Sequence, residues 1–265
     1  MALTEYINHS LEICTLSRAK HKQSHTVVDF KTTKHQQSYQ QSNTFPFNYN
    51  RKSNVEIIPR NIAQETYVDQ LLDPRIRLTV AAGPAGTGKT LLAVLAAIKA
   101  LKEGSINRIV ISRPAVSVDE EHGFLPGTLN EKMDPWVRPI MDVFEEYWSP
   151  IEIERMMENR VIEVCPLAYM RGRTFKNAYI ILDEAQNTTT SQMKMALTRI
   201  GSGSYMSVTG DLNQHDRGYE ENGLKNFVEL LALKNSDKIG ISWFTRNHVE
   251  RDVIVSEILS IYGED

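Results

Sequence analysis

The chain has 265 residues, of which 41% are hydrophobic and 24% are charged, and its formal net charge at pH 7 is −3. This composition is ordinary for a soluble globular protein, and the mild negative charge means that nucleic-acid or membrane binding would require a local basic patch. Cys14 and Cys165 lie far apart and outside any metal-ligand spacing, which argues against a disulfide framework and favours a reducing compartment. The longest apolar run, 91–98, is too short to span a bilayer and no secretory signal is recognisable, so we expect a cytoplasmic protein.

The first 54 residues are rich in Gln, Ser, Thr, His and Asn, and their apolar residues show no periodicity. We expect residues 1–54 to form a polar, flexible N-terminal tail. An oligomerisation arm is the alternative, because the histidines of this segment match no metal-ligand spacing.

From about residue 55 onward, short β-rich runs alternate with helical patterns. Most of the β-rich runs are almost continuously apolar, which is typical of strands buried on both faces of a parallel sheet. The alternation predicts a doubly wound α/β domain over 55–265, with a mainly parallel sheet flanked by helices. The predicted strands are 77–83, 108–114, 161–164, 178–184, 204–211 and 238–244, and the predicted helices are 90–101, 136–147, 151–158, 191–200, 224–233 and 249–262.

GPAGTGKT, at 83–90, follows the first predicted strand and opens a helix, as a phosphate-binding loop requires. Its glycines permit backbone torsions that turn amide N–H groups toward a phosphate at the positive end of the helix. Lys89 is expected to reach the β- and γ-phosphates, and Thr90 is expected to bind Mg²⁺. The nucleotide-binding residues predicted here are Gly83, Pro84, Ala85, Gly86, Thr87, Gly88, Lys89 and Thr90.

The apolar run AYIILDEAQN, at 178–187, ends in two adjacent acids. Asp183 lies at the predicted tip of the strand, where it would bind Mg²⁺ directly or through water. Glu184 would polarise the water that attacks the γ-phosphate, a role typical of a general base.

A second polar motif, TGDLNQ at 209–214, ends the next predicted strand. Ligands of open α/β sheets bind at the carboxyl ends of the strands, so Asp211 and its neighbours are expected to line the site. The amide of Gln214 is expected to contact both the γ-phosphate and the attacking water.

The complete motif series resembles the PhoH-like family of P-loop ATPases, which is related to superfamily 1 helicase cores. The resemblance covers roughly 57–262, with the motifs in one order, and implies a RecA-like fold that uses ATP and Mg²⁺. The final segment, RNHVERDVIV, lacks the Arg-His pair of many relatives. Besides the phosphate loop, the motifs are SRPAV at 112–116, GFLPG at 123–127, RGRTF at 171–175, DEAQN at 183–187, TGDLNQ at 209–214 and an arginine-containing terminal segment at 246–251.

The same resemblance suggests residues that complete the nucleotide site. Helicase-like ATPases place a glutamine upstream of the phosphate loop to recognise adenine, and Gln64 is the candidate, with an ordinary surface glutamine as the alternative. Hydrolysis also needs a cation on the γ-phosphate, for which the resemblance favours Arg246 and Arg251 on the final helix over Arg217 and Arg173. Superfamily 1 helicases take this arginine from a second α/β domain, and we expect no such domain in this chain. We therefore predict a homo-oligomer, a hexameric ring whose ATP sites lie at the subunit interfaces.

Two further segments carry candidates for nucleic-acid contacts. Arg113 lies at the end of a predicted strand, and an unusually long segment follows it. In helicases the equivalent strand end contacts the sugar–phosphate backbone, so Arg113 is a candidate for a phosphate contact. Arg171 and Arg173 lie between Tyr169 and Phe175, a combination suited to single-stranded nucleic acid, although intersubunit salt bridges are an equal alternative for both arginines.

Together these features predict a Mg²⁺-dependent ATPase coupled to single-stranded RNA or DNA. One alternative is a ring ATPase that acts on protein partners or as a stress regulator. A nucleotide kinase is another, which Glu184 and Gln214 disfavour.

Overall fold

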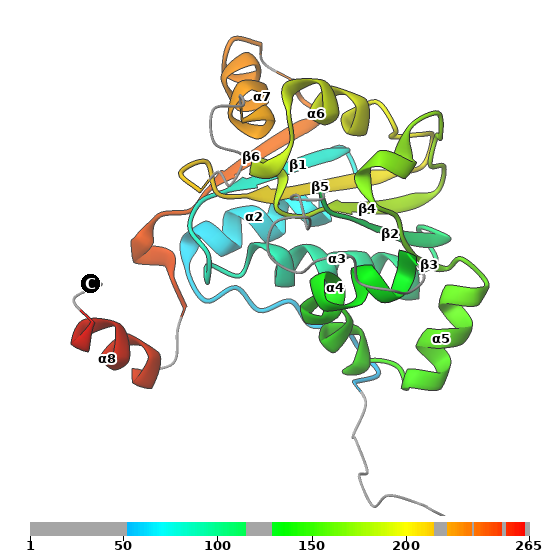
Figure 1. Cartoon of the computed structure of the whole chain (residues 1–265), viewed down its shortest axis with the longest axis horizontal. Helices are drawn as coiled ribbons and strands as arrows, with labels where there is room; N and C mark the ends of the chain where they lie inside the picture. The colour runs from blue at the N-terminus through cyan, green and yellow to red at the C-terminus, as the bar shows by residue number, and fades with distance from the viewer. Residues whose placement is uncertain (1–51, 115–128, 215–221, 235, 251–252, 263–265) are drawn as a thin grey trace, which may run out of the picture. The chain divides into compact units, whose positions relative to one another are not determined.

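A sheet of six strands, all paired in parallel, organises the described part of the chain in the order β3-β2-β4-β5-β1-β6 (Figure 1). The computed structural model describes residues 52–114, 129–214, 222–234, 236–250 and 253–262, so nearly all of the predicted tail over 1–54 lies outside the described residues. All six strands predicted from the sequence are confirmed, each within two residues of its expected ends. Their bounds are Leu78–Ala82 (β1), Arg108–Ser112 (β2), Ile162–Val164 (β3), Ala178–Leu182 (β4), Tyr205–Gly210 (β5) and Ile239–Trp243 (β6).

Helices cover both faces of the sheet (Figure 1). α2, α3 and α4 lie on one face, and α6 and α7 lie on the other. The helices are Ile62–Leu72 (α2), Lys89–Lys102 (α3), Leu129–Glu145 (α4), Pro150–Glu158 (α5), Thr190–Leu197 (α6), Gly223–Ala232 (α7) and Val253–Ile261 (α8), with shorter 3₁₀ turns at Leu167–Met170 (η1), Ala185–Asn187 (η2) and Arg246–His248 (η3). This is the doubly wound, RecA-like arrangement that the sequence predicts, with β5 inserted between the phosphate-loop strand β1 and the acidic strand β4.

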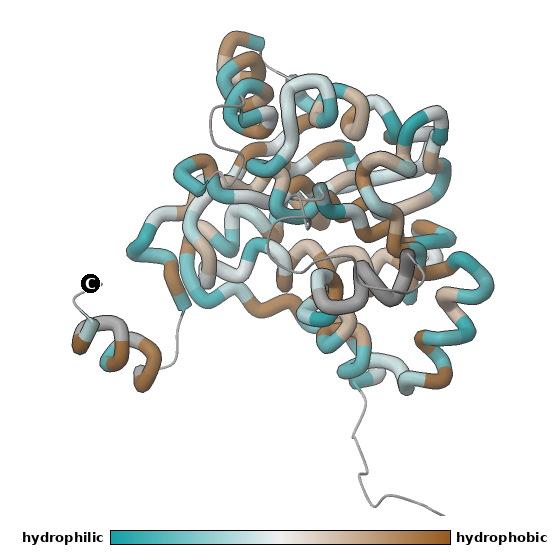
Figure 2. The backbone as a smooth tube through the Cα atoms, in the orientation of Figure 1, coloured by the Kyte–Doolittle hydropathy of each residue, from teal (hydrophilic) through white to brown (hydrophobic). Residues whose placement is uncertain are grey.

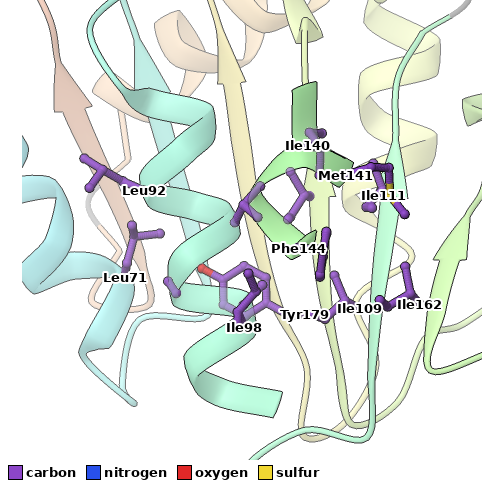
Figure 3. Packing of buried hydrophobic residues seen from close by; sticks show 14 of the residues in the cluster. Leu71, Leu92, Ile98, Ile109, Ile111, Ile140, Met141, Phe144, Ile162 and Tyr179 are labelled. Atoms are coloured by element: carbon purple, nitrogen blue, oxygen red, sulfur yellow. The ribbon is translucent and has the colours of Figure 1, made fainter. Parts of the chain in front are cut away.

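The continuous apolar runs are explained by burial on both faces of the strands. In β2, Ile109 and Ile111 pack into one core cluster, whereas Val110 between them packs into the other. Figure 3 shows Phe144 of α4 beside Ile109 and Ile162, which closes the first cluster over β2 and β3. The two cores fix the sheet between its helical layers.

Polar caps fix where several helices begin. The side chain of Ser149 accepts a hydrogen bond from the backbone of Glu152, whose carboxylate bonds back to Ser149, and Pro150 occupies the first turn of α5. Thr189 and Gln192 form the same reciprocal arrangement at the start of α6. These reciprocal bonds satisfy backbone N–H groups that would otherwise lack a partner at the start of α5 and α6.

The sequence prediction is wrong about the start of the final helix, which was expected at residue 249. α8 begins at Val253, and Arg246 lies on the preceding turn η3 and not on α8. The backbone N–H of Glu250 donates to the carbonyl of Gly86 at 3.0 Å, so this stretch is bonded to the phosphate loop and does not continue a helix. α8 itself is strongly hydrophobic (Figure 2), and Ile254, Ile258 and Ile261 are exposed.

The register brings four loops to one end of the sheet. Ala82 of β1 aligns with Gly210 of β5, and Leu182 of β4 aligns with Ser112 of β2. The phosphate loop, the DEAQ segment, the GDLN segment and Arg113 each follow directly after these strand ends. Among the described residues, no helix has the length and apolar character needed to cross a membrane.

Candidate active site

The phosphate loop connects β1 to α3 and requires glycine at two positions where other parts of the chain pack closely against its backbone. Gly83 has φ of +150°, and a Cβ there would lie 2.3 Å from the carbonyl oxygen of Phe244. Gly88, which precedes α3, has φ of +81°, and a Cβ there would lie 2.9 Å from the amide nitrogen of Gln64. Side chains at either position would displace the loop from the segments that hold it.

Lys89 is buried within this loop, with 8% of its surface exposed. Its ammonium donates to the carbonyl oxygens of Gly83 (2.7 Å) and Pro84 (2.6 Å) and to Oγ1 of Thr87 (3.2 Å). Burial lowers the pKa of Lys89, although the carboxylates of Asp211 and Asp183 oppose this effect. The loop therefore holds a poorly hydrated cation, for which a phosphate oxygen is a suitable additional partner.

Asp183 joins the phosphate loop to two neighbouring strands. Its Oδ1 atom accepts hydrogen bonds from Oγ1 of Thr90 (2.8 Å) at the start of α3 and from Oγ1 of Thr209 in β5. A hydroxyl and a carboxylate beside a phosphate loop form the hard oxygen donor set that Mg²⁺ uses together with nucleotide phosphates and water. Thr90 and Asp183 are thus brought together as the sequence predicts, and they fit this cation.

Glu184 follows Asp183 in a left-handed conformation, with φ of +52°. Its Oε1 atom lies 2.9 Å from the guanidinium of Arg113, and its Oε2 atom accepts a hydrogen bond from Gln186. Gln186 is 1% exposed, and its side-chain oxygen accepts the backbone N–H of Asp211 at 3.1 Å. Gln186 consequently links the DEAQ segment of β4 to the GDLN segment of β5.

A cavity of about 280 Å³ lies at this end of the sheet. The phosphate loop, Thr90, the acidic pair and Asp211 line it, and Gln214 contributes an exposed side chain. Most of the predicted nucleotide-site residues therefore surround one cavity. Its lining residues are Ala85, Gly86, Gly88, Lys89, Thr90, Leu91, Asp183, Glu184, Gly210, Asp211 and Gln214.

Gln64 lies against the phosphate loop and is 4% exposed. Its amide nitrogen donates to the carbonyl of Thr87 at 3.1 Å, and its amide oxygen accepts the backbone N–H of Arg60 at 2.9 Å. The alternative of an ordinary surface glutamine is therefore wrong. Adenine recognition by Gln64 stays a prediction, and in this structure the amide supports the loop.

The predicted arginines are distributed over different places. Arg113 reaches Glu184, whereas Arg173 forms an ion pair with Glu163 of β3 and lies over the ring of Phe175. Arg173 lines a different cavity, of about 720 Å³, between α4, α5 and β3. Arg173 thus forms its ion pair within the chain, and an intersubunit salt bridge for Arg171 stays a prediction.

Arg171 is exposed in the turn after η1. Arg246 is also exposed, on η3, in the segment that is bonded to the phosphate loop through Glu250. Arg217 and Arg251 lie outside the described residues. Which arginine acts on the γ-phosphate therefore stays a prediction.

Sequence reasoning missed three residues at this site: Gln186, Thr209 and Trp136. Trp136 of α4 accepts a hydrogen bond from Arg113 through its carbonyl at 2.7 Å, and the guanidinium lies 5.9 Å from the centre of the indole. Ser207 and Thr209 are polar positions inside an otherwise apolar strand that is buried from Met206 onward, and this contrast was the available signal. A buried hydroxyl in such a strand requires a partner, which for Thr209 is Asp183.

Comparison with solved structures finds partial alignments at low sequence identity. The UvsW helicase from bacteriophage T4 aligns with a TM-score of 0.44 and 15% identity, covering 74% of this chain and 62% of that one. A Sulfolobus solfataricus SWI2/SNF2 ATPase core in complex with dsDNA aligns with a TM-score of 0.40 and 16% identity, covering 72% of this chain and 45% of that one.

Curated relatives are much more similar in sequence. A PhoH-like protein of Mycobacterium tuberculosis is 48% identical over 208 residues, which are 78% of this chain and 58% of the relative. A PhoH-like protein of Bacillus subtilis is 47% identical over 207 residues, covering 77% and 63%. Protein PhoH of Escherichia coli is 38% identical over 211 residues, covering 78% and 58%. The chain thus spans about three fifths of the length of these relatives.

The sequence profile of the family described as PhoH-like protein matches residues 56–263, which include every strand of the sheet and every residue of the cavity. The chain therefore belongs to the PhoH-like family.

Proposed function

We propose that this protein binds ATP together with Mg²⁺ and hydrolyses it. The observation that carries the proposal is the hydrogen bond from Thr90 to Asp183, which joins the first turn after the phosphate loop to the end of the acidic strand. Glu184 is the next residue and lines the same cavity. A metal-binding pair beside a second carboxylate is the arrangement that hydrolysis requires.

Each side chain then has a defined task. Lys89 binds the β- and γ-phosphate oxygens, and Thr90 and Asp183 hold Mg²⁺, which neutralises phosphate charge when bound. Glu184 accepts the proton of the attacking water, and Gln214 orients that water at the mouth of the cavity. Placing the base directly beside the metal ligand favours hydrolysis over transfer to a second substrate, which is the reaction of the kinase alternative.

The metal site gives a first testable prediction. In Thr209→Val the hydroxyl that orients Asp183 is lost, so we expect the Mg²⁺ concentration for half-maximal ATP hydrolysis to rise about 10- to 100-fold. The measurement is phosphate release against Mg²⁺ concentration. Thr79→Val is the matched control, because Thr79 is also a buried strand threonine but bonds to the carbonyl of Met206. An unchanged Mg²⁺ requirement in Thr209→Val would show that Thr209 does not position a metal ligand.

We further propose that hydrolysis is coupled to single-stranded RNA or DNA. Arg113 supports this, since its guanidinium lies beside an indole that is 38% exposed, and a cation next to an aromatic face suits a phosphate and a stacked base. The alternative function is a ring ATPase that acts on protein partners or as a stress regulator, without a nucleic-acid substrate.

Phosphate release measured with poly-RNA, with single-stranded DNA and without polymer separates these functions. We expect stimulation by at least one polymer, and binding that weakens as the salt concentration rises. No stimulation and no salt-sensitive binding would exclude the nucleic-acid function and favour a protein partner.

We propose that Arg246 or Arg251 of a neighbouring copy supplies the cation that acts on the γ-phosphate. This requires an oligomer, which we propose to be a hexameric ring. The proposed compartment is the cytoplasm. The position of Arg246 near the segment that touches Gly86 supports a role at this face. A monomeric mass in the presence of ATP and Mg²⁺ would contradict the ring.

A further inference from the structure

The guanidinium of Arg113 is held from three directions at the end of β2. It donates to the carbonyl of Trp136 at 2.7 Å, lies 5.9 Å from the centre of that indole, and contacts Oε1 of Glu184 at 2.9 Å. The Arg113 side chain is 21% exposed, and that of Glu184 is 38% exposed, so solvent reaches the pair. An ion pair of this exposure is weak enough to be exchanged for another partner.

Both carboxylate oxygens of Glu184 are engaged in this arrangement. Gln186 donates to Oε2, while Arg113 occupies Oε1. A general base must direct a free lone pair at the water it deprotonates, within about 2.6–3.2 Å. The guanidinium of Arg113 takes a lone pair of Oε1 and offsets the negative charge that attracts the proton of the water, so this contact opposes the reaction. The contact with the neutral, buried Gln186 orients the carboxylate.

A cavity of about 310 Å³ adjoins this ion pair and shares Thr90, Asp183 and Glu184 with the nucleotide cavity. Arg113 is the cation in its lining beside these three polar residues, and its remaining walls are apolar. A flat base fits between such walls, and the negative phosphodiester beside it fits the guanidinium. The apolar wall residues are Leu91, Val94, Trp136, Pro139, Ile140 and Val143.

We propose that Arg113 is a releasable clamp on Glu184, and that a phosphodiester of single-stranded nucleic acid opens it by taking the guanidinium. Release leaves Oε1 of Glu184 free for the attacking water while Gln186 continues to hold Oε2. Arg113 is thus a positioning residue that restrains the base in the absence of polymer. The proposal rests on the proposed ATPase function and specifies how polymer binding stimulates it.

The coupling has to be reciprocal. Suppose that the state with the free carboxylate binds both polymer and the attacking water that a nucleotide positions. Mg²⁺ with a nonhydrolysable ATP analogue must then raise the affinity for polymer by the same factor by which polymer raises the affinity for the analogue. A merely structural ion pair would produce no such link between the two sites.

The test uses the full chain with Arg113→Gln, which removes the charge but keeps a donor for the Trp136 carbonyl, and with Arg113→Ala as a second variant. Without polymer, we expect kcat for ATP to rise about three- to tenfold at unchanged KM, since one charge-assisted contact on the base is lost. Stimulation by oligo(U), measured as the ratio of the two rates, should fall toward one. Arg138→Ala removes an arginine whose ion pairs, with Asp142 and Glu145, are more exposed, and it should leave both rates within about twofold of wild type.

The outcomes distinguish this proposal from the proposed function. If wild type is stimulated by oligo(U) but the basal kcat of Arg113→Gln is equal to or below wild type, the clamp is overturned and the nucleic-acid-coupled ATPase stands. If basal kcat rises but oligo(U) has no effect on wild type, the phosphodiester is overturned as the releasing ligand.

If neither Arg113 variant folds, tryptophan fluorescence of a chain that retains Arg113 can test the proposal instead. With Trp148 and Trp243 replaced by Phe, the emission of Trp136 reports on its stacked guanidinium. A change on adding oligo(U) supports release, and an unchanged emission at saturating polymer overturns it.

Discussion

Glu184→Gln is expected to bind ATP with wild-type affinity while its turnover falls about 10²- to 10⁴-fold, because an amide cannot accept the proton of the attacking water. The substitution preserves size, and its single amide oxygen can still accept a hydrogen bond from one of the two donors, Gln186 or Arg113, so the fold around η2 should persist. Fluorescent-nucleotide titration and phosphate release under the same conditions measure the two effects separately.

Glu103→Gln is the matched control, since Glu103 forms an exposed ion pair with Lys99 one helical turn away on α3. Its turnover should remain within about twofold of wild type. If Glu184→Gln hydrolyses ATP as fast as this control, Glu184 is not the base, and the water must be activated by another group.

The second large effect is expected for Lys89→Met, in which the buried cation is replaced by an apolar chain of similar length. Removing the charge from the phosphate site should lower kcat about 10²- to 10³-fold and weaken ATP binding. Stability should not fall in parallel, because burial already disfavours the charged form and lowers the pKa of Lys89. Thermal unfolding without nucleotide should therefore occur at or above the wild-type temperature.

Lys99→Met is the control for this change, since the Lys99 ammonium pairs with Glu103 at the surface of the same helix. A Lys89→Met protein that melts well below both wild type and Lys99→Met would mean that the ammonium is a structural link between the carbonyls of Gly83 and Pro84. The loss of activity in Lys89→Met could then come from a displaced loop, and a substitution that keeps the positive charge would be required to test phosphate binding by Lys89.

The sheet and the phosphate loop were predictable because their signals are local in sequence. Each strand appears as a short apolar run, and the loop motif lies between a strand and a helix, so neighbouring residues suffice to identify them. α2 was not predicted as a helix, although Asn61 caps it and Gln64 extends from it to the loop. Ile62 and Leu72 are apolar but exposed, and Gln64 is polar but buried, so periodicity gave only a weak signal there.

The bonds that assemble the site were not predictable, since they join strands far apart in the chain. Thr209 meets Asp183 only because β5 pairs with β4, and Arg113 meets Glu184 only because β2 lies on the other side of β4. Gln186 forms its bridge to Asp211 from a 3₁₀ turn that follows a left-handed residue, a geometry that no sequence period reveals.

The position of Arg246 has the same physical origin. Helical propensity continues through 249–262, but the backbone of Glu250 bonds to Gly86 and the side chain of Asn61 donates to Glu250 at 2.9 Å. These tertiary contacts fix an extended stretch before α8, so they override the local preference for helix. The segment that carries Arg246 is therefore tied to the phosphate loop.

The central claim is that this cavity is a Mg²⁺-dependent hydrolytic site, and phosphate release from ATP by the purified chain tests it most directly. The account predicts release that requires Mg²⁺, stops with EDTA and exceeds that of both Lys89→Met and Glu184→Gln at every protein concentration. Release by wild type that equals these two variants, with Mg²⁺ and with each polymer present, would contradict it.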